Sequence, residues 1–238
     1  ASISGDAQTE PLRQWALDNF GEDLLALPRE GRLYVWDQSA GTGNRAVVVS
    51  TAPSASNFMF VSQQDRHVIC LGTHGVASGF DPMLVRWSDQ NDYTNWNVNV
   101  SSTSGENQLG DGSELVTGLN TRNQSLIWTD NAVHAMEFVG PPFIFNFRQL
   151  GSNCGIAGQH AAIELDGRIF WMGAKDFFVY DGAVKNLPCT VRRYVFDDFN
   201  YDQKNKVYAG TNQEFREVTW LYPSKDSNEV DRYVSYNP

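Results

Sequence analysis

The chain has 238 residues, of which 41% are hydrophobic, and it carries a formal net charge of −10. This length and apolar content suffice for a packed core, which excludes a disordered protein. The acidic balance argues against a surface that grips nucleic-acid phosphates or docks on an anionic membrane.

The three cysteines, Cys70, Cys154 and Cys189, are odd in number and lack C-x-x-C spacing. They do not suggest a disulfide framework, so we expect folding in a reducing compartment. No apolar run approaches the roughly 20 residues that span a bilayer, and no signal-peptide pattern is visible. Because the chain starts at Ala1 rather than Met, we expect a processed or partial product.

The first predicted element covers residues 10–20. Its apolar residues gather on one side at helical spacing, and Pro11 lies near its start, which predicts one short N-terminal helix. An extended strand is nearly as well favoured, because Trp and Phe also favour strands.

Strand patterns alternate with turns through the rest of the chain. Asp166-Gly167 is the strongest hairpin signal, because Asp-Gly suits the tight turns that join antiparallel strands. The predicted strands cover residues 22–27, 32–37, 58–61, 67–71, 125–128, 132–138, 161–165, 168–172, 177–180, 206–210, 217–222 and 231–236.

These hairpins recur along the chain. Leu126, Ile169 and Val218 occupy comparable places in successive hairpins, 43 and 49 residues apart. Repeats of about 40–50 residues are typical of four-stranded propeller blades. We predict one all-β, β-propeller-like domain over residues 1–238, an array of antiparallel meanders with five or more blade-like units. The five units lie near residues 12–50, 56–80, 113–140, 159–187 and 205–237, with an inserted loop region at about 81–112. A β-sandwich with long loops remains an alternative.

The sequence predicts no metal site and no cofactor. The histidines, at positions 67, 74, 134 and 160, form neither H-x-H nor H-E-x-x-H. The acidic clusters near Asp89 and near Asp197 lack the ordered ligand spacing of a calcium loop, so solvated turns explain them better.

The sequence also predicts no enzyme and no catalytic residue. The segment 151–155 looks like a nucleophile elbow, but its serine is misplaced, and Cys154 is expected to be a buried structural residue. The carboxylate pairs Glu164/Asp166 and Asp176/Asp181 lie in or beside tight turns rather than facing a predicted cleft. Four tryptophans, at positions 36, 128, 171 and 220, are predicted to pack in the core, and Trp96 is predicted to be exposed.

The most informative segment is residues 81–96, where a predicted buried strand, 83–87, leads into a polar loop closed by Tyr93 and Trp96. Together with seven other stretches it resembles, in order, the tail hub or nozzle proteins of tailed double-stranded DNA bacteriophages, of the tail tubular or DNA-stabilisation type. Those other stretches are residues 15–29, 33–37, 66–72, 126–130, 140–143, 170–172 and 220–223.

The resemblance implies a structural virion protein of the tail, assembled in the host bacterial cytoplasm. It implies a homo-oligomeric ring, expected to be sixfold, that contacts portal or adaptor proteins and tail fibre or spike proteins. Phage DNA would pass through during ejection without specific binding, and no membrane insertion is implied. An acidic lumen suits such a conduit because it repels phosphates.

Two segments are the predicted subunit contacts, the loop 88–96 and the segment 140–147. The candidate interface residues are Arg86, Trp87, Asp89, Tyr93, Trp96, Pro141, Pro142, Phe143 and Phe145. Prolines stiffen a strand edge, and the phenylalanines offer more apolar surface than a free edge should show. The alternative is that the aromatic side chains enter the core by alternation.

Two further functions remain open at the sequence level. One is a carbohydrate-binding propeller module for host receptor recognition, with Trp96 as the sugar-stacking residue. The other is a propeller hydrolase, for which the chain shows no catalytic pattern.

Overall fold

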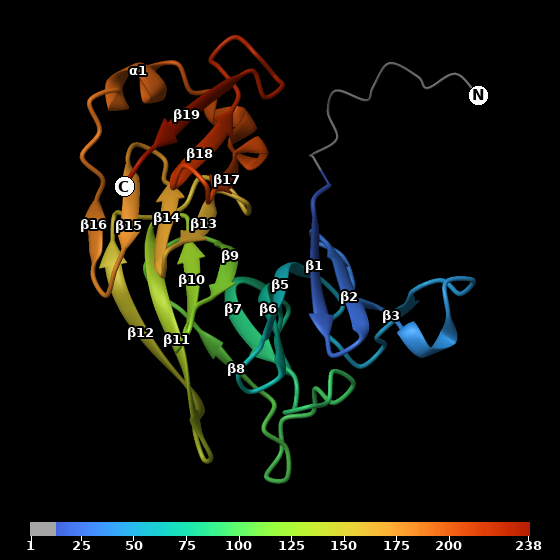
Figure 1. Ribbon diagram of the computed structural model, residues 1–238. Coiled ribbons are helices and arrows are strands. Elements are labelled where there is room, and N and C mark those ends of the chain that lie inside the picture. Colours follow the sequence, from blue (N-terminus) through green and yellow to red (C-terminus); the bar gives the residue numbers. More distant parts are fainter. Residues whose placement is uncertain (1–12) are drawn as a thin grey trace.

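The computed structural model describes residues 13–238, and these form a five-bladed β-propeller in which five antiparallel sheets are arranged in a ring (Figure 1). Blade 1 contains β1 (Trp15–Phe20), β2 (Asp23–Pro28), β3 (Tyr34–Trp36) and β4 (Val47–Val48). Blade 2 contains β5 (Ser56–Ser62), β6 (His67–His74), β7 (Phe80–Trp87) and β8 (Gly105–Gln108). Blade 3 contains β9 (Leu115–Asn120), β10 (Ser125–Thr129), β11 (Ala132–Gly140) and β12 (Ile144–Ser152).

The last two blades differ in strand number. Blade 4 contains β13 (Ala162–Leu165), β14 (Arg168–Met172), β15 (Phe177–Tyr180) and β16 (Val184–Asn186). Blade 5 contains three strands, β17 (Tyr208–Asn212), β18 (Glu217–Tyr222) and β19 (Arg232–Tyr236). The described helices are short: η1 (Gln38–Ala40), α1 (Arg192–Asp197) and η2 (Tyr201–Lys206). None of them has the length and apolar character needed to cross a membrane.

The predicted all-β fold with five blade-like units is confirmed, and so is the strongest predicted turn. Asp166 and Gly167 join β13 to β14 with φ angles of 53° and 74°. A two-residue hairpin of type I′ needs positive φ at both central residues, and Asp-Gly adopts this conformation at little cost.

The predicted N-terminal helix is wrong for the residues that the structure describes. Residues 15–20 form β1, with Ala16 opposite Leu27 and Phe20 opposite Asp23, while residues 10–12 lie outside the described part. Ala16 and Phe20 are buried in the core that blade 1 shares with blade 2. Pairing with β2 and this packing outweigh the helical spacing, since local propensity is weaker than tertiary context.

The predicted insertion at 81–112 is too long. Residues 80–87 and 105–108 are β7 and β8, the third and fourth strands of blade 2, which leaves 88–104 as the inserted loop. The predicted unit at residues 56–80 was therefore too short, because the loop displaces the fourth strand of this blade along the sequence.

The core lies between neighbouring blades. Leu126, Ile169 and Val218, the residues that marked the repeat, are all buried in the second strands of blades 3, 4 and 5. Two positions beyond each of them lies a buried tryptophan, at 128, 171 and 220. Trp36 is only half-buried, so the predicted core role holds for three of the four strand tryptophans.

A cluster of four polar side chains connects three of the blades. Glu114 forms ion pairs with Arg29 at 3.2 Å and with Lys204 at 3.6 Å, and Arg29 also donates to Asn205. Arg29 follows β2, Glu114 precedes β9 and Lys204 precedes β17, so the cluster connects blades 1, 3 and 5.

Replacing Trp220 by Phe should destabilise the protein by about 1–3 kcal/mol, because it removes the indole N–H that donates to the carbonyl of Ala161 at 3.0 Å. Trp15→Phe is the matched control, since Trp15 is 49% exposed, and its cost should stay within about 0.5 kcal/mol. Urea denaturation, monitored by fluorescence, measures the free energy of unfolding of both variants. Equal losses would contradict the assignment of Trp220 to the interblade core.

Candidate functional site

Two projections lie at the same end of the molecule, the hairpin formed by β11 and β12 and the loop 88–104 between β7 and β8 (Figure 1). They contain all but two of the residues predicted for subunit contact. The exceptions, Arg86 and Trp87, are the last residues of β7, directly before the loop.

Asp89 organises the loop. Its Oδ1 accepts hydrogen bonds from the backbone N–H of Thr103 at 2.7 Å and from the Thr103 hydroxyl at 2.5 Å. The amide of Asn95 donates to its Oδ2 at 2.9 Å. One carboxylate therefore joins the start, the middle and the end of the loop.

Arg86 and Trp96 hold the base of the loop from inside. The guanidinium of Arg86 donates to the carbonyl oxygens of His74 and Trp96 and lies 3.8 Å from Glu106. It also lies over the Trp96 ring, 5.9 Å from its centroid. Burial lowers the pKa of Arg86, although the neighbouring Glu106 acts in the opposite direction.

His67 joins the loop to the hairpin. Its Nδ1 lies 2.8 Å from Asp65, and its Nε2 lies 3.1 Å from the hydroxyl of Thr103. The same imidazole packs on Phe145 of β12 at 5.0 Å and on Phe138 of β11 at 5.7 Å. The hairpin formed by β11 and β12, called the arm below, therefore contacts blade 2 as well as its own sheet.

The hairpin tip, defined here as residues 138–143, carries exposed apolar surface. Phe138 and Val139 are exposed on the β11 side, and Phe143, after the cis Pro141–Pro142 peptide, is 78% exposed. Next to the tip, Phe145 turns inward and packs on Trp87 with ring centroids 5.3 Å apart. Phe143 lies in the turn before β12, and the positive φ of Ile144 (62°) interrupts the strand geometry between it and the inward Phe145.

The predicted interface residues divide into three groups. Pro141, Pro142 and Phe143 are exposed. Asp89 and Tyr93 are half-buried, with the Tyr93 hydroxyl donating to Asp23 at 3.3 Å. Arg86, Trp87, Trp96 and Phe145 are buried within the protein.

The side chains of these last four residues are buried and offer little surface to a neighbouring subunit, and their predicted interface role stays a prediction. The prediction of an exposed Trp96 is wrong, since it is only 2% exposed. Its indole N–H donates to the carbonyl of Tyr93, so the residue closes the loop rather than stacking on a sugar.

Two exposed residues of the loop were missed by sequence reasoning. Val98 and Val100 present apolar side chains to solvent, and Val100 is fully exposed at 109% of the reference value. The available signal was their alternation with asparagine in an otherwise polar segment, 97–100.

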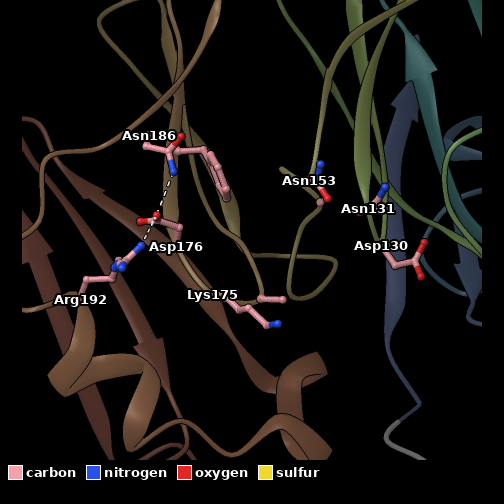
Figure 2. Close-up of a pocket in the computed structure, with 10 residues that line it drawn as sticks. Asp130, Asn131, Asn153, Lys175, Asp176, Asn186 and Arg192 are labelled. Atoms are coloured by element: carbon pink, nitrogen blue, oxygen red, sulfur yellow. Dashed lines mark hydrogen bonds and ion pairs between the residues drawn. The ribbon is translucent and has the colours of Figure 1, made fainter.

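Away from these two projections, a polar cavity of about 320 Å³ lies between blades 3 and 4. Figure 2 shows Lys175 between two groups of polar side chains, Asp176, Asn186 and Arg192 on one side and Asp130, Asn131 and Asn153 on the other. Asp130 and Asn131 lie in the turn between β10 and β11, and Lys175 and Asp176 lie in the turn between β14 and β15. Asn153 follows β12, Asn186 ends β16, and Arg192 begins α1.

The two carboxylates of the cavity are already engaged in the fold. Asp176 accepts from Asn186 and from Arg192, each at 2.8 Å. Asp130 accepts from the hydroxyl of Ser113 at 2.6 Å and from its backbone N–H at 2.7 Å. Burial opposes ionisation of Asp130, but these hydrogen bonds outweigh it and lower its pKa. A general acid for glycoside hydrolysis needs a raised pKa, so Asp130 does not suit that role.

The other groups considered for chemistry take structural roles. Asp166 pairs with Arg216 at 2.6 Å, and Asp181 pairs with Lys185 at 2.8 Å. Cys154 is buried, and burial raises the pKa of its thiol to about 11, which suppresses the nucleophilic thiolate. Within residues 13–238 no three His, Cys, Asp or Glu side chains are grouped as metal ligands would be.

No protein-family model matches this chain, and no curated protein matches it by sequence. Solved structures do resemble it. The extracellular domain of a one-component system from B. thetaiotaomicron matches with a TM-score of 0.51 and 12% identity, over 88% of this chain and 26% of that one. A protein assigned as a gluconolactonase matches with a TM-score of 0.48 and 11% identity, over 85% and 68%. Hsv2 of Kluyveromyces lactis matches with a TM-score of 0.45 and 8% identity, over 92% and 61%.

The first of these likenesses shows the fold alone, and the other two, with TM-scores below 0.5, carry no argument. The chain spans about a quarter of the length of the first of these proteins. The low identities transfer no activity, ligand or partner, because one fold hosts many unrelated functions.

Replacing Asp89 by Asn should loosen the loop, because an amide nitrogen replaces one of the two acceptor oxygens that hold Thr103 and Asn95. Limited proteolysis near neutral pH should cleave within residues 90–102 at least about fivefold faster than in the wild type. Asp92→Asn is the control, since Asp92 bonds only within its own turn, to Thr94. Equal cleavage of both variants would contradict the anchoring role of Asp89.

Acid should release the same loop in the wild type. Burial opposes ionisation of Asp89, but the hydrogen bonds from Thr103, Gln90 and Asn95 outweigh it and lower its pKa. Its stabilisation is complete above the unfolded-state pKa of about 3.9 and is lost as the pH falls through the lower folded-state pKa. Hydrogen exchange of residues 88–104, corrected for the intrinsic rate, should rise below about pH 4. An exchange rate independent of acidification would show that the loop does not depend on ionised Asp89.

Proposed function

We propose that this protein is a structural component of a bacteriophage tail, a wall segment of the nozzle or hub ring through which DNA leaves the virion. The observation that supports this most is the hairpin tip. It presents Phe143 to solvent on an arm that packs on blade 2 through His67 and Trp87. Exposed apolar surface held in a fixed place is characteristic of contacts between proteins.

The order of sequence elements that resembles tail hub and nozzle proteins supports the same function. In the proposed ring, which we take to have six copies, each hairpin tip contacts the next subunit through a heterologous contact that closes. Portal or adaptor proteins and tail fibre or spike proteins are the proposed neighbours. The virion tail is the proposed location.

The net charge of −10 fits the proposed passage of DNA. A lumen of the same sign as the phosphates repels the genome and prevents it from sticking. Mapping charge onto an assembled ring tests this feature, and a basic bore would overturn it.

Phe143→Ser should weaken ring assembly at least tenfold, which corresponds to about 1.4 kcal/mol per contact. Phe215→Ser is the matched control, because Phe215 is 60% exposed but lies in the turn between β17 and β18, on another blade. Light scattering coupled to size exclusion, with negative-stain microscopy, measures the assemblies. A wild-type protein that stays monomeric at every concentration, or equal effects of both variants, would overturn the role of the hairpin tip. Immunogold labelling of tailed particles that contain the protein tests the location.

The alternative function is a carbohydrate-binding propeller module for host receptor recognition. The polar cavity favours it, since Asn131, Asn153, Asn186 and Lys175 offer donors and acceptors in a volume suited to a small ligand. Trp96 has no part in this proposal because it is buried.

A glycan array tests the carbohydrate hypothesis. Specific binding should fall at least tenfold, or about 1.4 kcal/mol, on Asn153→Ala and should persist in Asn146→Ala, an exposed residue of β12. The absence of glycan binding would remove this alternative and leave the tail proposal unaffected.

A further inference from the structure

His67 is a buried histidine, and both nitrogens of its ring face a hydrogen-bond partner. It begins β6, and its side chain is buried together with that of Asp65. Its Nδ1 lies 2.8 Å from Oδ1 of Asp65, and its Nε2 lies 3.1 Å from the hydroxyl oxygen of Thr103. A neutral imidazole has one donor and one acceptor, so the protons on these partners determine the charge of the ring.

The hydroxyl of Thr103 has one proton, and Asp89 accepts it. The Thr103 oxygen lies 2.5 Å from Oδ1 of Asp89, the short distance of a hydroxyl that donates to a carboxylate. Burial opposes ionisation of Asp89, but hydrogen bonds from Thr103, Gln90 and Asn95 outweigh it and lower its pKa. Asp89 is therefore an ionised acceptor at neutral pH, and Thr103 has no proton left for His67.

The lone pairs of the Thr103 oxygen need two donors. The backbone N–H of Gln90 donates to this oxygen at 2.8 Å, and the other donor is Nε2 of His67. On the opposite side of the ring, Oδ2 of Asp65 accepts from the hydroxyl of Ser62 at 2.8 Å, and Oδ1 accepts from Nδ1 of His67. Both ring nitrogens are therefore donors, which requires a positively charged ring.

We propose that His67 is a buried imidazolium whose proton holds the loop 88–104 and the arm on blade 2, so that it serves as a pH-sensitive switch. The positive charge lies between the carboxylates of Asp65 and Asp89, the second of which it reaches through Thr103. Deprotonation of Nε2 leaves its lone pair facing an oxygen lone pair at 3.1 Å, with no proton between them. The loop then loses its hydrogen bond to β6, and the arm, which packs on the same ring, is weakened with it.

The other charged side chains of the surrounding elements are engaged away from the ring. In the described part of the chain, the ion-pair partner of the His67 ring is Asp65. Arg66, the neighbour in sequence, lies over the ring of Phe20 at 5.1 Å. The remaining charges pair with one another, Glu137 with Arg148 on the arm at 3.7 Å and Arg86 with Glu106 on β7 and β8 at 3.8 Å. A buried charge is tolerated when it is paired and hydrogen-bonded, as here.

The direction of the pH dependence follows from the proton count. An unfolded chain releases a histidine proton near a pH of about 6.5. Because the folded protein retains this proton to higher pH, the stabilisation is complete below about pH 6.5 and is lost as the pH rises to the point where folded His67 releases it. Acid therefore releases the loop through Asp89, and alkali releases it through His67.

NMR of the histidine ring nitrogens tests the charge directly. At about pH 7.5, one unit above the usual histidine value, both nitrogens of His67 should be protonated. His134 is the internal control, because burial lowers its pKa although Asp111 acts in the opposite direction, and it should show one unprotonated nitrogen. An unprotonated nitrogen on His67 at this pH would overturn the proposal.

Hydrogen exchange tests the switch. Between about pH 6.5 and pH 9, exchange of residues 88–104, corrected for the intrinsic rate, should rise at least about tenfold while that of β14 stays unchanged. Thr103→Val lacks the hydroxyl, so its loop should already exchange fast at neutral pH and show no further rise. Thr103→Ser keeps the hydroxyl and should restore the wild-type profile.

A valine variant with the same alkaline rise as the wild type would show that Thr103 acts only through packing, and this would overturn the switch. So would a wild-type loop whose exchange stays constant while the nitrogens of His67 lose a proton. Both measurements use the protein by itself, so their outcome is independent of the tail function.

Discussion

Packing of apolar side chains between neighbouring blades is the interaction on which the rest of the structure depends. Trp128 and Trp171 meet edge to face at 5.5 Å across blades 3 and 4, and Trp220 packs on Phe177 at 4.9 Å across blades 4 and 5. Hydrogen bonds add direction to this packing. The indole of Trp171 donates to the carbonyl of Cys154, and that of Trp220 donates to the carbonyl of Ala161. Each hydrogen bond joins a tryptophan side chain to the segment that leads into blade 4. The bonds therefore fix the orientation of the indole rings as well as their position.

Packing of this kind also holds the hairpin formed by β11 and β12 in place. A long hairpin outside its sheet is marginally stable by itself in water. Here Phe145 packs on Trp87 and His67, so the arm gains a hydrophobic contact with the neighbouring blade. Because Thr103 bonds both His67 and Asp89, the loop and the arm share one network of contacts. The exposed apolar surface of the tip is therefore presented in one arrangement rather than many, which lowers the entropy cost of binding a neighbour.

The number of blades was predictable from the sequence because it follows from local pattern. Leu126, Ile169 and Val218 recur at a nearly constant spacing, and Asp166-Gly167 adopts its turn from its own backbone preference. The strand at residues 15–20 was assigned as a helix because its apolar spacing suits both structures, and only the partner strand β2 decides between them. The predicted extent of blade 2, residues 56–80, was too short because the loop 88–104 separates its third and fourth strands.

The candidate contact surface was only partly predictable. The sequence alone determined that the chain is rich in short antiparallel strands, that they repeat as blades, and that apolar side chains gather around Pro141 and Pro142. Only the tertiary structure decided that Phe143 faces solvent while Phe145, Arg86, Trp87 and Trp96 are buried. The physical reason is that alternation along a strand does not say which of its faces will be covered, and it does not apply to Phe143, which lies in the turn before β12. Which face is covered depends on the blade that packs against it, and that blade is distant in sequence.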